Sequence, residues 1–380
     1  MSRSTLSLRS VVPLLVLACS VGFTTVNAQL DPAVTQPLAD KRFTYPDQIP
    51  YMVDTDVGTR RGPQQGYNIC NSTTEGAASM CQTSMVNSID DFCLWAPSKV
   101  GSTIADTEGE EVAWCTKPGR GTRIIPPGAL TGVQFMKTPD YLQVVGFLKQ
   151  ELINLTPDDY GGELDPHGAD LRGNPMGGLM YSNGFPSNNG NNGTYQQVIE
   201  WHNFMGGGAF CMKVCDPAGP NAANFCQHIY DRIGCAYNAP NAAQNNVFET
   251  CEGENQDFPG VYTDPSGAVQ TYTQPPESLG AISTMPYQPR VPASSNCVTH
   301  SAAELYASAA ALYPSASASA AAPTATGTGS VAAGSGRVNA ATGSRSAGTP
   351  SATGATNGAG VMHASFFGLV GALTASALLL

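Results

Sequence analysis

The residues best suited to chemistry lie close together in one glycine-rich segment, residues 161–185. Glu163, Asp165, His167 and Asp170 occur within eight residues of this segment. Two carboxyl groups can act as acid and base in glycoside hydrolysis when their surroundings separate their pKa values. Carboxylates and an imidazole can instead bind a metal ion. Asp and Asn also bond their own backbone in turns, and the sequence favours this structural role over ligand binding or catalysis.

Two further histidines, His202 and His228, lie far along the chain and would meet His167 only through the fold. A single histidine is more often a packing residue than a ligand, so we predict no metal site and no cofactor. The Gly-x-Ser-x-Gly motif of esterases and the glycine patterns of nucleotide-binding folds are missing from the sequence. The sequence therefore leaves an enzyme open but favours a protein without catalytic activity.

The elements that must position these residues are mainly β-strands. Short runs rich in β-forming residues and bounded by turn residues occupy 122–126, 132–136, 141–148 and 207–215. Residues 194–204 and 223–233 are the candidate helices. We expect a mainly β domain, sandwich-like or barrel-like, with few short helices and disulfide-tied loops.

Ten of the eleven cysteines follow the first 28 residues. They are Cys70, Cys81, Cys93, Cys115, Cys211, Cys215, Cys226, Cys235, Cys251 and Cys297. An even number in an exported chain predicts up to five disulfides, with a pairing that the sequence leaves open. Zinc is disfavoured, because only Cys211 and Cys215 have a close spacing.

Export is predicted by residues 1–28, where Arg3 and Arg9 precede a short apolar stretch and small residues end it, as in a signal peptide. A polar lead-in follows at 29–42 and ends in Lys41-Arg42, a candidate processing site. Residues 43–300 are expected to form the disulfide-rich extracellular domain.

The composition then changes to Ser, Thr, Ala and Gly. Residues 301–357 bury too little apolar surface to fold and are predicted to be a disordered, O-glycosylated stalk. Residues 358–380 contain an uncharged apolar segment and are predicted to be a propeptide removed when a GPI anchor is attached. Asn357 is the preferred attachment residue, with Ser351 and Gly354 as alternatives.

Three sequons predict N-glycosylation at Asn71, Asn154 and Asn192, although Pro157 follows the second one and lowers its odds. The formal net charge of −11 disfavours nucleic acid as a partner, because such binding depends on clustered Lys and Arg.

Four segments of the chain, residues 121–128, 138–146, 165–175 and 206–215, resemble the basidiomycete family of macrophage-activating glycoproteins and immunoreactive mannoproteins. The resemblance covers about residues 43–300 and implies a mannosylated protein of the cell membrane or wall that host immune cells recognise. It carries over no catalytic residue.

Two functions follow. The first is a GPI-anchored, N- and O-mannosylated fungal surface protein, a structural or binding component of the envelope and an immune antigen. Its expected partners are the membrane through the lipid, and wall polysaccharide and host immune receptors through the glycans. The alternative is a module that binds or hydrolyses wall polysaccharide through residues 161–185.

Overall fold

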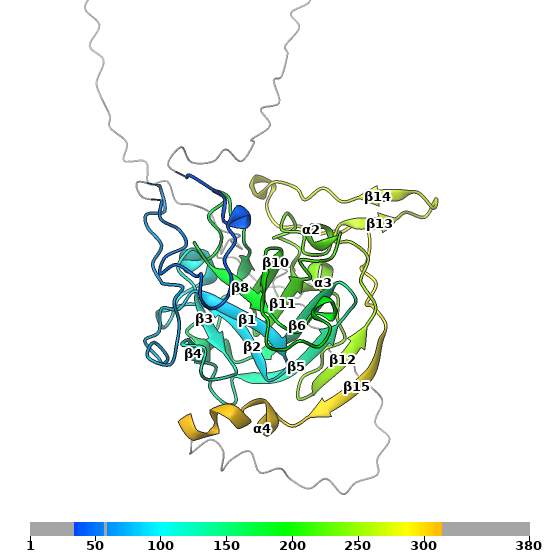
Figure 1. Ribbon diagram of the computed structural model, residues 1–380. Coiled ribbons are helices and arrows are strands. Elements are labelled where there is room, and N and C mark those ends of the chain that lie inside the picture. Colours follow the sequence, from blue (N-terminus) through cyan, green and yellow to red (C-terminus); the bar gives the residue numbers. More distant parts are fainter. Residues whose placement is uncertain (1–33, 57–58, 314–380) are drawn as a thin grey trace, which may run out of the picture.

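The computed structural model describes residues 34–56 and 59–313 (Figure 1). Two sheets form the body of the domain, and a small third sheet lies at one end. The order of the six-stranded sheet is β4 (Arg123–Ile124), β3 (Val112–Cys115), β2 (Asp91–Ala96), β1 (Thr83–Ser88), β8 (Leu179–Ser182) and β9 (Gln196–Val198). The order of the seven-stranded sheet is β15 (Ser294–His300), β12 (Phe248–Gly253), β5 (Leu130–Lys137), β6 (Tyr141–Leu148), β11 (Ala209–Cys215), β10 (Trp201–Gly206) and β7 (Gly162–Leu164). Strands β13 (Val261–Thr263) and β14 (Val269–Thr271) pair with each other.

The main hydrophobic core joins the two large sheets. Trp95 of β2 and Trp201 of β10 pack with tilted rings whose centroids are 5.9 Å apart, and Phe92 of β2 stacks on Phe210 of β11 at 6.2 Å. Burial of such large side chains is the main driving force for closing a sandwich. The predicted mainly β fold is confirmed, and of the two architectures left open, sandwich-like or barrel-like, the two packed sheets correspond to the first.

The helices are short. They are α1 (Ile104–Thr107), α2 (Ala222–Phe225), α3 (Gly234–Asn238) and α4 (Ala302–Leu305), with 3-10 turns η1 (Leu38–Asp40), η2 (Gln150–Ile153), η3 (Pro186–Asn188), η4 (Glu277–Leu279) and η5 (Ala307–Leu312). The helix predicted over residues 194–204 is wrong, because β9 and most of β10 occupy them. Every residue of β10 is buried, so the strand lacks the alternation that usually marks one.

All ten predicted cysteines pair, which confirms the expected five disulfides. The bonds are Cys70–Cys81, Cys93–Cys115, Cys211–Cys235, Cys215–Cys226 and Cys251–Cys297. Two of them start from β11 and tie the segment that carries α2 and α3 to the outer face of the seven-stranded sheet.

Residues that precede and follow the expected domain (43–300) in the sequence also pack onto this core. Leu38 is buried, and its N–H donates to the carbonyl of Leu171. Leu305 and Tyr306 are buried in the main core, where the Tyr306 hydroxyl accepts a hydrogen bond from the N–H of Leu130. The folded part therefore includes residues 34–42 and 301–313.

The predicted signal peptide, most of the predicted stalk, and the candidate anchor residues Ser351, Gly354 and Asn357 lie outside the described residues. Among residues 34–56 and 59–313, no helix combines the length and apolar character needed to cross a bilayer.

Candidate functional site

Asp165 closes the turn that presents His167. One of its carboxylate oxygens accepts hydrogen bonds from the backbone N–H groups of His167 at 2.7 Å and Gly168 at 2.9 Å. Asp165 and Asn174 pair through their backbones, and the N–H of Gly173 donates to the carbonyl of His167. The carboxylate of Asp165 is thus committed to its own loop, as in an Asx turn.

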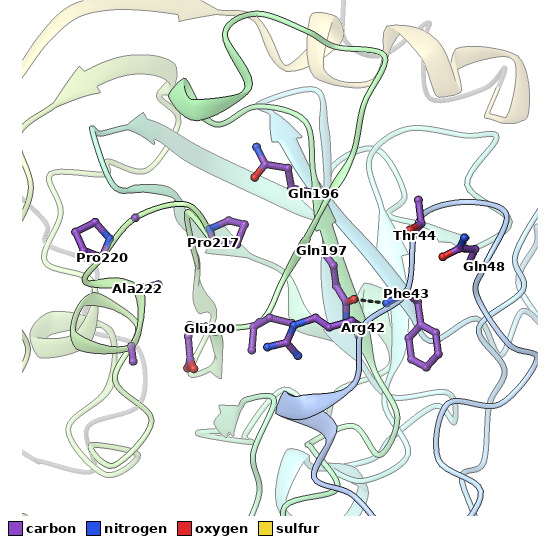
Figure 2. Close-up of a pocket in the computed structure, with 13 residues that line it drawn as sticks. Arg42, Phe43, Thr44, Gln48, Gln196, Gln197, Glu200, Pro217, Pro220 and Ala222 are labelled. Atoms are coloured by element: carbon purple, nitrogen blue, oxygen red, sulfur yellow. Dashed lines mark hydrogen bonds between the residues drawn. The ribbon is translucent and has the colours of Figure 1, made fainter.

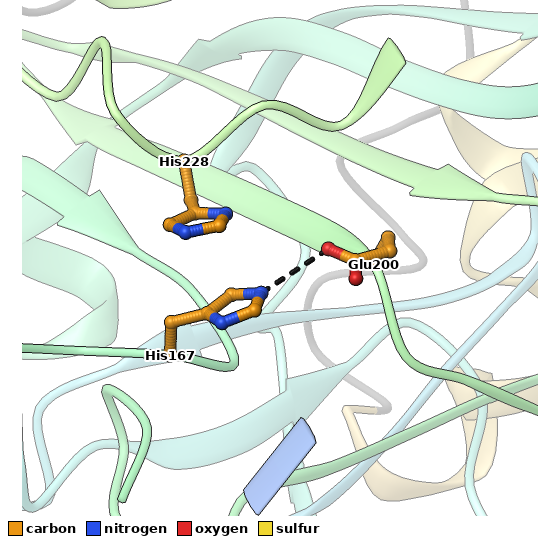
Figure 3. Close-up of side chains that lie close together, drawn as sticks. All are labelled: His167, Glu200 and His228. Atoms are coloured by element: carbon orange, nitrogen blue, oxygen red, sulfur yellow. Dashed lines mark hydrogen bonds and ion pairs between the residues drawn. The ribbon is translucent and has the colours of Figure 1, made fainter. Parts of the chain in front are cut away.

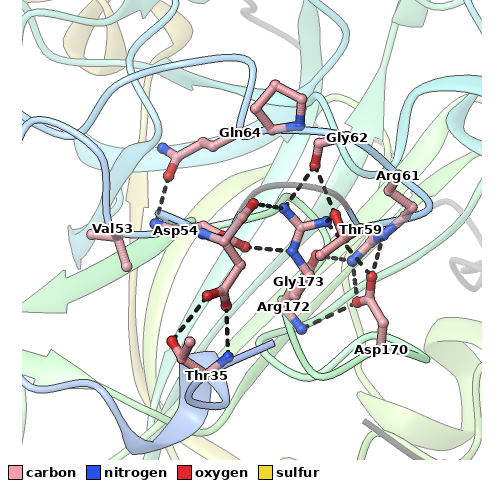
Figure 4. Close-up of polar contacts among 12 residues, drawn as sticks. Thr35, Val53, Asp54, Thr59, Arg61, Gly62, Gln64, Asp170, Arg172 and Gly173 are labelled. Atoms are coloured by element: carbon pink, nitrogen blue, oxygen red, sulfur yellow. Dashed lines mark hydrogen bonds and ion pairs between the residues drawn. The ribbon is translucent and has the colours of Figure 1, made fainter. Parts of the chain in front are cut away.

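Asp170 and Arg172 fasten the same loop to the N-terminal segment (Figure 4). Asp170 forms a bidentate ion pair with Arg61. Arg172 is almost fully buried, donates to Asp54 at 2.7 Å, and also bonds the hydroxyl of Thr59. Both pairs hold the loop in place, and the carboxylates of Asp165 and Asp170 are engaged in contacts that support it.

Glu163 lies apart from these residues, on the outer face of the seven-stranded sheet. Its side chain comes within 4.0 Å of His202, and neither carboxylate oxygen has a hydrogen-bond partner among the described residues. Burial raises the pKa of Glu163 well above the usual range of a glutamate. It also lowers the pKa of His202 well below the usual value of a histidine. Burial thus disfavours the charged form of both groups.

His167 instead meets Glu200 and His228 (Figure 3). His167 follows β7, Glu200 directly precedes β10, and His228 lies between α2 and α3. The Nε2 atom of His167 is 3.2 Å from the Oε2 atom of Glu200. The two imidazole rings stack with centroids 3.6 Å apart and planes 13° from parallel. One potential ligand atom from each of the three residues lies within 4.8 Å of the other two.

The two histidines differ in their electrostatic surroundings. Burial would lower the pKa of His167, but the hydrogen bond and charge of Glu200, helped by Asp165, raise it overall. Burial, together with the charge of His167, lowers the pKa of His228 to about 4. Near pH 6 a charged His167 can thus stack on a neutral His228.

A pocket of about 660 Å³ lies next to this cluster (Figure 2). Its lining includes Glu200 together with Arg42, Phe43, Gln196 and Gln197. The N–H of Phe43 donates to the side-chain oxygen of Gln197 at 2.7 Å, which fixes one wall. Glu200 therefore belongs both to the histidine cluster and to a pocket with polar hydrogen-bonding groups.

The sequence anticipated only part of this arrangement. The fold brings His228 to His167, places His202 beside Glu163, and engages Asp165 and Asp170 in contacts of their own loop and of Arg61. Glu200 was not predicted as a site residue. Its position just before a fully buried strand, in Glu200-Trp201-His202, was the available signal.

The sequons differ in exposure. Asn71 and Asn192 are exposed. Asn154 is only 9% exposed, its amide nitrogen donates to the carbonyl of Pro97 at 3.0 Å, and its backbone is left-handed with φ of 77°.

Two curated fungal proteins match the chain. It is 42% identical over 269 residues to appressorium protein ROW1 of Mycosarcoma maydis, a match that covers 69% of this chain and 59% of ROW1. It is 40% identical over 207 residues to appressorium protein ROW2 of the same organism, which covers 53% of this chain and 69% of ROW2. The chain thus matches about three fifths of ROW1. No protein-family model matches the chain. No solved structure matches it either.

Proposed function

Because this chain belongs to the family of the fungal appressorium proteins ROW1 and ROW2, we propose that it is an exported glycoprotein of the fungal cell surface. One observation carries the proposal: all ten cysteines after the first 28 residues are paired. Five disulfides are typical of chains that fold in the secretory pathway and rare in the reducing cytosol.

The test is to express the full chain in a fungal host and count free thiols in protein released from intact cells by surface labelling. We expect surface-labelled protein whose ten cysteines react with an alkylating reagent only after reduction. Ten reactive thiols before reduction, or no labelled protein at the surface, would overturn the proposal.

A GPI anchor is the finer part of this proposal. The small residues around Asn357 and the uncharged apolar segment after residue 364 support removal of 358–380 and attachment at Asn357. A phosphatidylinositol-specific phospholipase should then release the protein from membranes. In a variant with large residues at Ser351, Gly354 and Asn357, the anchor signal should remain uncut and the enzyme should release nothing.

Glycans are the proposed means of contact with partners. We propose N-glycans at Asn71 and Asn192, which are exposed, and O-glycans on the Ser/Thr-rich residues after 313. The resemblance to the mannoprotein family supports mannose as the sugar. On this basis the protein would contact wall polysaccharide and host immune receptors, and it would act as an antigen.

The alternative function, binding of wall polysaccharide by the protein itself, is supported by the pocket beside Glu200. Gln196 and Arg42 line it with amide and guanidinium groups, which are suited to sugar hydroxyls. Hydrolysis has less support, because the carboxylates of Asp165 and Asp170 are engaged in the loop. A glycan array probed with deglycosylated wild type and with deglycosylated Gln196→Ala distinguishes contact through glycans from polysaccharide binding by the protein itself. Glycan binding by the wild type that is lost in Gln196→Ala indicates a binding site on the protein.

A further inference from the structure

We propose that His167, Glu200 and His228 form a binding site for a divalent first-row transition-metal ion, such as Zn²⁺ or Cu²⁺. This site goes beyond the surface role proposed above and does not depend on it. Two imidazoles and one carboxylate are a ligand set that these ions accept.

The distance between His167 and Glu200 already suits one ion. Two ligands bound to one tetrahedral ion at about 2.0–2.2 Å are themselves about 3.3–3.6 Å apart. The 3.2 Å between Nε2 of His167 and Oε2 of Glu200 lies close to the lower end of this range. A metal ion would replace the proton that now bridges these two atoms.

His228 completes the set after a change in its side-chain torsion. Parallel stacked rings direct their nitrogens side by side instead of toward one point, so the ring must turn to bind the same ion. Its Nδ1 atom is buried and has no hydrogen-bond partner among the described residues. Figure 3 shows that both rings present a nitrogen on the side where Glu200 lies. The turn therefore breaks no hydrogen bond of Nδ1.

The backbones that carry the ligands are held in place independently of a metal. The Asp165 turn fixes His167. Cys215 supports both Glu200 and His228. Its N–H donates to the carbonyl of Glu200 at 3.0 Å, and it forms a disulfide with Cys226, two residues before His228. A site whose supports are already formed loses little conformational entropy when the ion binds.

The charges around the cluster favour a cation. Besides Glu200, the carboxylates of Asp165 and Asp40 act on His167, and that of Asp231 acts on His228. Arg42 lines the neighbouring pocket, but its guanidinium donates to the carbonyls of Ala39 and Lys41. Three protein ligands leave at least one coordination position for water or for a molecule in the pocket.

The experiment uses the purified full-length protein without an affinity tag, stripped with a chelator and dialysed. Calorimetric titration with ZnCl₂ or CuCl₂ should give one strong site per chain. Two variants test the ligands: Glu200→Gln, which keeps the size of the side chain but removes its charge, and His228→Ala. Each should weaken metal binding by at least about 100-fold, because the loss of a residue that only hydrogen-bonds a ligand already weakens it by about 10- to 100-fold. His300→Ala is the matched control, because His300 lies in β15 outside the cluster and should leave affinity unchanged.

A measurement on the wild type tests the ligands without depending on whether the variants fold. Electron paramagnetic resonance of the Cu²⁺-loaded protein should show coupling to two imidazole nitrogens. Absence of strong binding in the wild type, a copper spectrum without nitrogen coupling, or unchanged affinity in both folded variants would each overturn the proposal.

Discussion

The imidazole rings of His167 and His228 lie face to face with centroids 3.6 Å apart, although one follows strand β7 and the other lies between α2 and α3, after strand β11. Two covalent or hydrogen-bonded supports produce this contact: the Asp165 turn on one side and the Cys215–Cys226 disulfide on the other. The contact therefore depends on the integrity of the outer face of the seven-stranded sheet.

The first prediction concerns a variant without the Cys215–Cys226 disulfide. Cys215→Ala/Cys226→Ala should lower the free energy of unfolding by about 2–4 kcal/mol and free the loop that carries His228. Urea denaturation measures the stability, and NMR of the histidine ring protons reports the stacking. Cys70→Ala/Cys81→Ala is the matched control, because its disulfide has the same sequence separation of 11. It should cost a similar free energy and leave the histidine signals in place. Equal ring shifts in both variants would contradict this reading.

The second prediction concerns the buried ion pair of Arg172 with Asp54. Arg172→Met should lower the free energy of unfolding by about 3–5 kcal/mol, because it leaves a buried carboxylate without its partner. Arg290→Met, which breaks half-exposed pairs with Glu254 and Asp257, should cost less than about 1 kcal/mol. Urea denaturation of both variants tests the contrast, and a cost below about 1 kcal/mol for Arg172→Met would refute it.

The third prediction concerns the pH dependence of stability. Burial raises the pKa of Glu108 to about 7 from its ordinary value of 4.5. Between these values the folded protein binds more protons than the unfolded chain, so this carboxyl makes the free energy of unfolding fall as pH rises. Glu108→Gln should therefore be more stable than wild type at pH 7.5, on the order of 1–3 kcal/mol, and the difference should shrink toward pH 4.5.

The difference between Glu108→Gln and wild type, followed by urea denaturation across this pH range, cancels the titration of groups that both proteins share. His228 is one such group: its lowered pKa makes stability fall as pH drops from about 6.5 to about 4. A difference that does not change with pH would show that Glu108 is not the group responsible.

The fourth prediction concerns glycan occupancy. Asn71→Gln and Asn192→Gln should each remove one N-glycan, seen as faster migration that matches enzymatic deglycosylation. Asn154→Gln should leave the migration unchanged, because the Asn154 amide is buried and bonded to Pro97. It should also cost about 1–3 kcal/mol, because a buried hydrogen bond is lost and a longer side chain must adopt a left-handed backbone.

Thr156→Ala is the control for this prediction. It destroys the sequon of Asn154 but keeps the asparagine and its hydrogen bond. Its migration should equal that of the wild type. A lost glycan in Thr156→Ala would mean that Asn154 is modified before the domain folds.

The sequence by itself determined the features that depend on local chemistry or on composition. The β-forming runs at 132–136 and 141–148 became β5 and β6, since turn residues bound them. The even set of ten cysteines required closed pairs, and the Asp-Pro-His-Gly order of residues 165–168 produced an Asx turn. Each of these follows from residues a few positions apart.

Only the tertiary structure decided which cysteines pair, why residues 201–206 form a strand, and which residues surround His167. Glu200 and His228 reach His167 because β10 and β11 are neighbours and a disulfide from Cys215 folds the next loop back over them. Such contacts join segments far apart in the chain, and their free energy depends on how the sheets pack. A pattern of residues close together in the sequence does not determine that packing.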